Sequence, residues 1–275
     1  MSSNVQISPF GIAISKLFMK LMFRPMHGWK QAVPKRAEYF LQRGLDGSQL
    51  EGSIQTSPST NVKGVVLLCH PFLKYGMHYF FNSELDKALL DSGFHVVSFN
   101  FKGFGCSNIK GHAFSDDVIS IAKMIEQRFP GLPIHSLGYS FGGFHLSHAL
   151  AKNETPFASA VLDSVPGTVT VFFKKGILAK AMKWISSSHL ATPTGTSPII
   201  GSLRRVENLP IKFLYGLEDE YILDTDLEEL KLNCRNMEFA SFPGCGHLDN
   251  YKMRKKDYLQ ELVGFFEANS LTKQN

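Results

Sequence analysis

The sequence has few cysteines, and they are scattered. Cys69, Cys106, Cys234 and Cys245 form no C-x-x-C pair. Neither a zinc site nor a disulfide framework is therefore indicated. We expect free thiols in a reducing compartment, and hence a cytoplasmic protein.

Long apolar runs are absent as well. No stretch reaches the roughly 18 uninterrupted apolar residues of a membrane-spanning helix, and the N-terminus lacks the basic start and small-residue cleavage site of a signal peptide. The net charge is only +5, with no RNA-binding signature beside it, so nucleic acid is not an expected partner. With 44% hydrophobic and 19% charged residues, the 275-residue chain can bury a large core.

What the sequence does contain is an alternation of apolar runs and amphipathic stretches. Asp46-Gly47 lies between two extended runs, which is a hairpin signal. Strands are expected at 38–43, 49–56, 65–69, 96–101, 134–139, 158–165, 211–215 and 237–242. Helices are expected at 84–92, 116–129, 141–151, 227–232 and 251–268. This order predicts an α/β fold, with a mostly parallel central sheet and helices on both faces.

A G-x-S-x-G motif stands at the junction of one predicted strand and helix. Gly138-Tyr139-Ser140-Phe141-Gly142 follows an apolar strand and opens an amphipathic helix. A serine on such a turn is held in a strained backbone conformation and points out of the sheet, while the glycines keep side chains out of the crowded turn. The sequence therefore predicts Ser140 as a nucleophile.

A serine nucleophile needs a general base and an acid that orients it. Only His189 and His247 follow Ser140 by more than a helix, since His145 and His148 lie on the helix after the motif and are expected in packing or solvent. His247 directly follows the last β-rich run, where catalytic groups gather in open α/β sheets. We predict His247 as the base.

Two aspartates at strand ends compete for the role of the acid. Asp219 closes the loop after the 211–215 strand, and Asp163 ends the preceding strand. Asp224 and Asp226 lie further along the same loop as Asp219. Asp219 is the preferred candidate, with Asp163 left as the alternative.

The loop after the 65–69 strand is expected to complete the site. One oxyanion donor should be the backbone N–H of Phe141, the residue after the nucleophile. The other should come from His70-Pro71-Phe72, and because proline has no N–H, Phe72 is the better candidate. His70 itself is interpreted as a structural histidine that bonds to the loop backbone.

Together these motifs resemble the α/β-hydrolase superfamily, most closely its lipase, esterase and lysophospholipase-like serine hydrolases. The resemblance runs from about residue 37 to 269. Two positions depart from the family pattern, since Asn100 and Lys102 stand where its D-x-R-G-x-G-x-S loop has Asp and Arg. The resemblance implies a triad that needs no metal or organic cofactor. It also implies that an insertion at 166–206 forms a cap over the site.

The expected organisation is an N-terminal segment (1–34), a core (35–165 and 207–275) and a cap or lid (166–206). The cap region contains no acidic residue but six basic ones, which are Lys174, Lys175, Lys180, Lys183, Arg204 and Arg205. It forms either a solvated basic face or a lid that attracts an anionic partner. Residues 10–24 are predicted to form a basic amphipathic helix, which either contacts a membrane peripherally or docks on the core.

The sequence thus predicts a serine hydrolase that cleaves an ester or thioester of an apolar, lipid-like acyl group. Action on acyl-CoA or acyl-carrier protein is the alternative enzyme function. A hydrolase-fold binding protein with little catalysis is the alternative from another class, although such proteins usually lack a triad member.

Overall fold

The computed structural model describes residues 26–28, 31–111, 113–152, 154–168, 171 and 198–270. These residues form one eight-stranded sheet with the strand order β1-β2-β4-β3-β5-β6-β7-β8. The strands are β1 (Glu38–Arg43), β2 (Gln49–Gln55), β3 (Gly64–Cys69), β4 (Phe94–Phe99), β5 (Ile134–Tyr139), β6 (Phe157–Asp163), β7 (Ile211–Gly216) and β8 (Met237–Phe242). The described helices are α2 (His78–Ser83), α3 (Leu85–Asp91), α4 (Phe114–Arg128), α5 (Phe141–Leu150), α7 (Ile199–Leu203), α8 (Asp224–Asn233), α9 (Asn250–Met253) and α10 (Lys255–Ala268).

The sheet is antiparallel at one edge and parallel in the rest. β1 and β2 form the expected hairpin, and β2 pairs antiparallel with β4. The other five pairings, from β4 through β3, β5, β6 and β7 to β8, are parallel. The prediction of a mostly parallel α/β sheet is confirmed. Because the parallel strands run the same way, their carboxyl ends meet at one edge, where ligands bind in folds of this kind.

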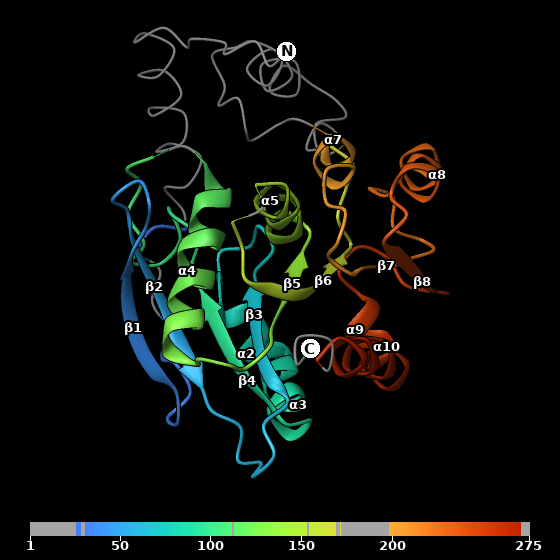
Figure 1. Cartoon of the computed structure of the whole chain (residues 1–275). Coiled ribbons are helices and arrows are strands. Elements are labelled where there is room, and N and C mark those ends of the chain that lie inside the picture. The colour runs from blue at the N-terminus through green and yellow to red at the C-terminus, as the bar shows by residue number, and fades with distance from the viewer. Residues whose placement is uncertain are drawn as a thin grey trace, which may run out of the picture.

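Helices cover both faces of this sheet (Figure 1). Alternate side chains of β3 show how: Val65 and Leu67 belong to the core cluster that contains α4 and α5. Val66 and Leu68 belong to the cluster that contains α3 and α10. Each buried Val or Leu contributes about 1.5–3 kcal/mol, so an uninterrupted apolar run is what a strand between two helical layers requires.

Most boundaries fall within a few residues of the prediction, and three differences have a bearing on the site. β4 ends at Phe99, because Phe101 turns away from the ladder and donates its N–H to His70 Nε2 at 3.2 Å. The helix expected over 251–268 is two helices, since Arg254 leaves the helical conformation at φ −127° and ψ 43° and donates hydrogen bonds from its guanidinium to Pro243 O. α2 was not predicted.

The two segments expected outside the core are only partly described. Within 166–206, α7 packs in the core, because Ile199, Leu203 and Val206 are buried in the cluster shared with α5 and α8. The amphipathic part of the expected cap, 172–184, and the amphipathic helix at 10–24 lie outside the described residues. In the ranges that are described, every helix falls short of the length and apolarity needed to span a bilayer.

Candidate active site

Ser140 occupies a strained turn between β5 and α5. Its backbone adopts φ 45° and ψ −110°, a conformation that costs a residue with a side chain about 1–3 kcal/mol. The neighbouring positions require glycine because there is no room for a side chain. A Cβ on Gly142 would press on the carbonyl oxygens of Cys69 and His70, and one on Gly143 would press on Gly138 O. The backbone of this turn therefore lies directly against the end of β3.

The side chains of Ser140, His247 and Asp219 form one hydrogen-bonded row. His247 Nε2 lies 3.0 Å from Ser140 Oγ, and His247 Nδ1 lies 2.8 Å from Asp219 Oδ2. The Asp219 side chain is completely buried, while 17% of the His247 side chain is exposed. The elements that supply these residues are the β5–α5 turn and the loops after β7 and β8. The structure therefore brings together the three residues that the sequence analysis selected.

The competing aspartates lie elsewhere. Asp163, the last residue of β6, accepts hydrogen bonds from Ser164, Asn250 and Tyr258. Asp224 and Asp226 lie in the first turn of α8.

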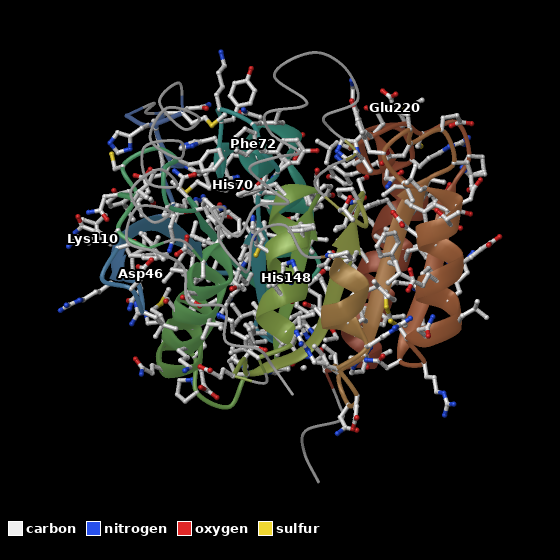
Figure 2. The ribbon with its side chains drawn as sticks, turned by 90° about the horizontal axis from the view of Figure 1, so that it is seen from above. Asp46, His70, Phe72, Lys110, His148 and Glu220 are labelled. Carbon is white, nitrogen blue, oxygen red and sulfur yellow. The ribbon has the colours of Figure 1, made fainter. Side chains whose placement is uncertain are left out.

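The two expected oxyanion donors come from neighbouring loops. Phe141 opens α5, where the first N–H groups of a helix have no partner within the helix. Phe72 follows β3 (Figure 2), and its ring packs edge-on against the ring of Phe141 with centroids 5.3 Å apart. Since Gly142 also contacts this loop, the arrangement places both backbone segments beside Ser140.

The remaining histidines near the motif are packing residues. His70 is fully buried; its Nδ1 lies 2.8 Å from Pro71 O and its Nε2 accepts the N–H of Phe101. Burial lowers the pKa of His70 to about 4, so it stays neutral and fits the structural role that was expected. His145 is buried against Phe114 and Phe141.

The departures from the family loop are structural. Lys102 is buried between Asp46 and Asp117, and lies 3.1 Å from Asp117 Oδ1. Burial alone would lower the pKa of Lys102, but these two carboxylates outweigh it and raise that pKa. Asn100 links β2 to the start of α2: it donates to Glu51 Oε1 at 2.6 Å and accepts the N–H of Met77 at 2.7 Å.

Two residues around the row, Tyr221 and Asn250, were not predicted from the sequence. Tyr221 donates its N–H to Asp219 Oδ1 at 3.0 Å, and its ring lies 4.9 Å from the ring of His247. A carboxylate that accepts the N–H two residues later is a known local pattern, so this contact had a signal. Asn250, three residues after His247, had none.

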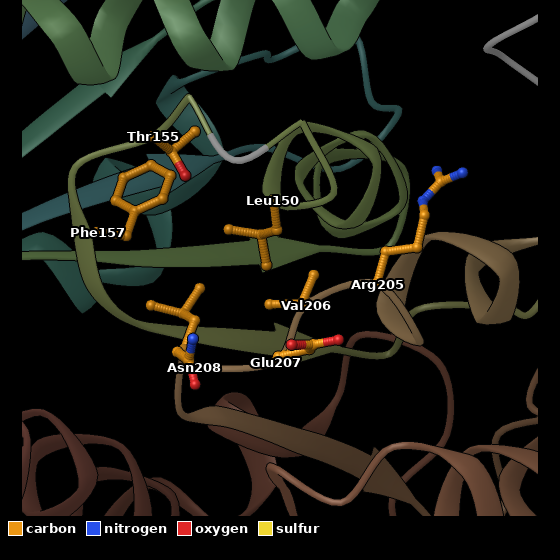
Figure 3. Close-up of a pocket in the computed structure, with 8 residues that line it drawn as sticks. Leu150, Thr155, Phe157, Arg205, Val206, Glu207 and Asn208 are labelled. Atoms are coloured by element: carbon orange, nitrogen blue, oxygen red, sulfur yellow. The ribbon is translucent and has the colours of Figure 1, made fainter.

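A pocket in the described part of the chain lies away from this row. It encloses about 430 Å³ and is lined by Leu150, Thr155, Phe157, Arg205, Val206, Glu207, Asn208 and Leu209 (Figure 3). Phe157 begins β6 and Leu209 precedes β7, which places the pocket at the amino edge of the sheet, opposite Ser140. Within the described ranges, no group of three or more His, Cys, Asp or Glu side chains could hold a metal ion.

Comparison with known proteins agrees with this architecture. A family model described as alpha/beta hydrolase fold matches residues 64–187. No curated protein sequence matches the chain significantly. An esterase from Pyrococcus furiosus is similar in structure, with a TM-score of 0.69 and 16% identity over 88% of this chain and 98% of that chain. A carboxyl esterase from Bacillus coagulans has a TM-score of 0.63 and 12% identity over 86% and 100% of the two chains.

The fold itself is shared by proteins whose names differ in substrate. A proline iminopeptidase from Mycobacterium smegmatis has a TM-score of 0.65 and 13% identity, covering 85% of this chain and 99% of that chain. At such identities the likeness concerns the fold alone. The matching model, the strand order and the strained strand-to-helix turn together show that the chain has the α/β-hydrolase fold.

Proposed function

We propose that the protein is a serine hydrolase that cleaves a carboxylic ester of an apolar acyl group through an acyl-enzyme. The observation that carries this proposal is the row Ser140–His247–Asp219, with successive separations of 3.0 and 2.8 Å. Both separations are ordinary hydrogen-bond distances. The strained backbone of Ser140 is the second support, since strain of this kind concentrates at functional sites.

In the proposed first step, Ser140 Oγ attacks the ester carbonyl carbon while His247 Nε2 takes the hydroxyl proton. The oxyanion that forms is stabilised by the backbone N–H groups of Phe141 and Phe72. As the tetrahedral intermediate collapses, the carbon–oxygen bond to the alcohol breaks and His247 returns the proton to the leaving oxygen. Asp219 holds the Nδ1–H tautomer and stabilises the imidazolium.

Water completes the proposed cycle. It attacks the acyl carbon, gives a proton to His247, and releases the carboxylic acid as Ser140 regains its hydrogen. No step requires a metal or an organic cofactor.

Phenylalanines favour an apolar acyl group. The rings of Phe72 and Phe141 are only partly buried, and they flank the site where the oxyanion would form. Phe101 and Phe104 back them from the core. Most of this aromatic cluster therefore serves packing, and the two half-buried rings are the part that substrate would meet.

A thioester substrate is the second candidate. The insertion after β6 carries six basic residues and no acidic one, and a basic cover would attract the phosphates of CoA or an acidic carrier protein. We propose 166–206 as the cap region, apart from α7 and Val206 at its end, which pack in the core with 35–165 and 207–275. We also propose residues 1–34 as a peripheral membrane contact, because their basic and apolar faces suit an anionic interface.

The direct test is hydrolysis of a short p-nitrophenyl ester together with labelling by a fluorophosphonate. We expect turnover and labelling by the wild type, and a loss of kcat on the order of 10⁶ in Ser140→Ala. Ser115→Ala, which alters another buried serine, is the matched control and should keep both. Retained activity in Ser140→Ala would refute the mechanism. A folded wild type that neither turns over nor labels would favour a binding protein instead.

A further inference from the structure

Behind the row of Ser140, His247 and Asp219 lies a second buried aspartate. Asp163 is 0% exposed. In the part of the chain that the structure describes, its carboxylate is held by neutral hydrogen-bond donors and no cation. Burial of an ionised carboxylate costs several kcal/mol unless hydrogen bonds compensate for it. The buried carboxylate of Asp163 therefore has a role other than pairing with a positive charge.

One carboxylate oxygen reaches the segment that carries His247. Asp163 Oδ1 accepts Ser164 Oγ–H at 2.9 Å and Asn250 Nδ2–H at 2.7 Å. Ser164 Oγ in turn accepts the N–H of Leu248, the residue after His247, at 3.3 Å. Leu248 has φ 66° and Ser164 has φ 54°. This branch thus joins two strained backbone positions, one after β6 and the other next to His247.

The other oxygen reaches the segment that carries Ser140. Asp163 Oδ2 accepts Tyr258 O–H at 2.7 Å, and the hydroxyl oxygens of Tyr258 and Tyr139 are 2.6 Å apart. Because Tyr258 has one hydroxyl proton and gives it to Asp163, Tyr139 must donate to Tyr258. Tyr139 directly precedes Ser140, whose own N–H donates to Asp163 O at 2.9 Å. An ionised carboxylate therefore fixes the direction of every hydrogen bond in this branch.

Resting on the function proposed above, we propose that Asp163 is a positioning residue for the catalytic row. Its ionised carboxylate holds the Leu248 backbone through Ser164 and the start of α9 through Asn250. It holds the strand end before Ser140 through Tyr258 and Tyr139. Displacements of about 1 Å at a catalytic group can cost on the order of 100-fold in rate. We call the hydrogen bonds from Asp163 to these two segments the clamp, and we expect their loss to lower turnover.

The clamp has a protonation state that can be tested. Burial raises the pKa of Asp163 to about 6, although the bonds from Tyr258, Asn250 and Ser164 oppose the rise. The titratable groups that face it are Tyr139 from β5, Tyr258 from α10 and Tyr79 from α2; burial raises the pKa of each above its usual value. These phenols stay neutral where Asp163 titrates. As the pH falls through about 6, the carboxylate takes a proton and can no longer accept all of its bonds.

The experiment is the pH dependence of kcat/KM for a short p-nitrophenyl ester. Protonation of the general base stops the proposed reaction, and protonation of Asp163 should slow it further by about the same factor as the amide in Asp163→Asn does. Log kcat/KM should therefore fall with a slope steeper than 1 over the one to two pH units below pH 6. In Asp163→Asn that slope should fall to about 1. kcat at its plateau should drop about 10- to 100-fold, with little change in KM, because geometry and not binding is lost.

Two further variants separate positioning from folding. Tyr258→Phe keeps the ring and removes one hydrogen bond to the ionised form of Asp163, so the pKa of Asp163 should rise and the acid limb should move to higher pH. Asp86→Asn is the matched control. Asp86, on α3, is also buried with a raised pKa. Its Oδ2 accepts a hydrogen bond from Gln55 Nε2 of β2 at 2.9 Å. It should leave kcat and the slope unchanged.

Wild-type kcat and slope in Asp163→Asn would overturn the proposal. So would a wild-type slope of about 1 with no movement of the limb in Tyr258→Phe, and this second result decides the matter if Asp163→Asn does not fold. Failure of the proposed function looks different: the wild type itself would show no turnover and no fluorophosphonate labelling, and both proposals would fall.

Discussion

Two aspartates at the carboxyl edge of the sheet differ in their hydrogen-bond partners. Asp219 uses Oδ2 for His247 Nδ1 and Oδ1 for the N–H of Tyr221. Asp163 uses both oxygens for Ser164, Asn250 and Tyr258. Both lie at strand ends, so position along the chain could not decide between them. The hydrogen-bond partners do.

Asp219→Asn should therefore impair catalysis far more than Asp163→Asn. The amide at 219 either favours the wrong tautomer of His247 or fails to stabilise its imidazolium, and the equivalent change in a serine triad costs about 10⁴ in kcat. The amide at 163 disturbs only the geometry of the row. kcat of both variants on one p-nitrophenyl ester gives the ranking. The reverse order would assign the acid to Asp163.

At the scale of elements, the sequence located the strands well and the support around the site poorly. Apolar runs between turn residues predicted β5 with both ends correct, because a strand buried on both faces has a short-range signature. The break at Arg254 had no signature, since neither Gly nor Pro stands there. The contacts from Asp163 to Asn250 and Tyr258 join residues 87 and 95 positions apart. Such contacts depend on how α9 and α10 pack on the sheet, and a local sequence pattern does not predict that packing.

The contact between α5 and the loop after β3 gives a prediction at this scale. Gly142→Ala places a methyl group against the carbonyl oxygens of Cys69 and His70, which are backbone atoms and cannot swing aside. The start of α5 must then move away from the Phe72 loop. We expect kcat to fall about 10²- to 10³-fold, as when one oxyanion donor is lost.

Gly264→Ala is the matched control for that variant. Gly264 lies in α10, and a Cβ there would meet nothing within 4 Å. The change should leave kcat intact and stabilise the fold by about 0.5–1 kcal/mol, since alanine is the better helix former. Thermal melting and ester turnover of the two variants, measured together, test the argument. Equal kcat in both would contradict it.

At the scale of the whole molecule, the three residues of the proposed triad lie at one edge of the sheet. The end of the N-terminal segment is hydrogen-bonded to the loop after β4. Gly28 donates its N–H to Gly105 O at 2.7 Å, and Gly105 donates to Met26 O at 3.1 Å. Gln31 Nε2 donates to Asn82 Oδ1 at 3.2 Å. Residues 26–28 thus belong to the core surface, and a truncation that spares them leaves these bonds in place.

Removal of residues 1–25 tests the membrane role without breaking the hydrogen bonds of residues 26–28. Ile14, Leu17 and Phe18 share one face of the predicted helix, and Lys16, Lys20 and Arg24 recur on another. Each basic residue near an anionic surface adds about 1 kcal/mol, and apolar burial adds to that. The intact protein should float with anionic vesicles at low salt, and the truncated protein should not. Both should turn over a soluble ester at similar rates.

The combined substitutions Lys16→Glu and Lys20→Glu separate charge from the alternative of a helix docked on the core. If the segment binds membranes, they should weaken flotation and leave the melting temperature unchanged, because the basic face would lie outside the core. A docked helix predicts the opposite pair of results for the truncation: no flotation of the intact protein, and earlier melting or aggregation once the apolar face of the helix is stripped away. Absence of binding by the intact protein at low salt would refute the membrane role, since screening is weakest and attraction strongest there.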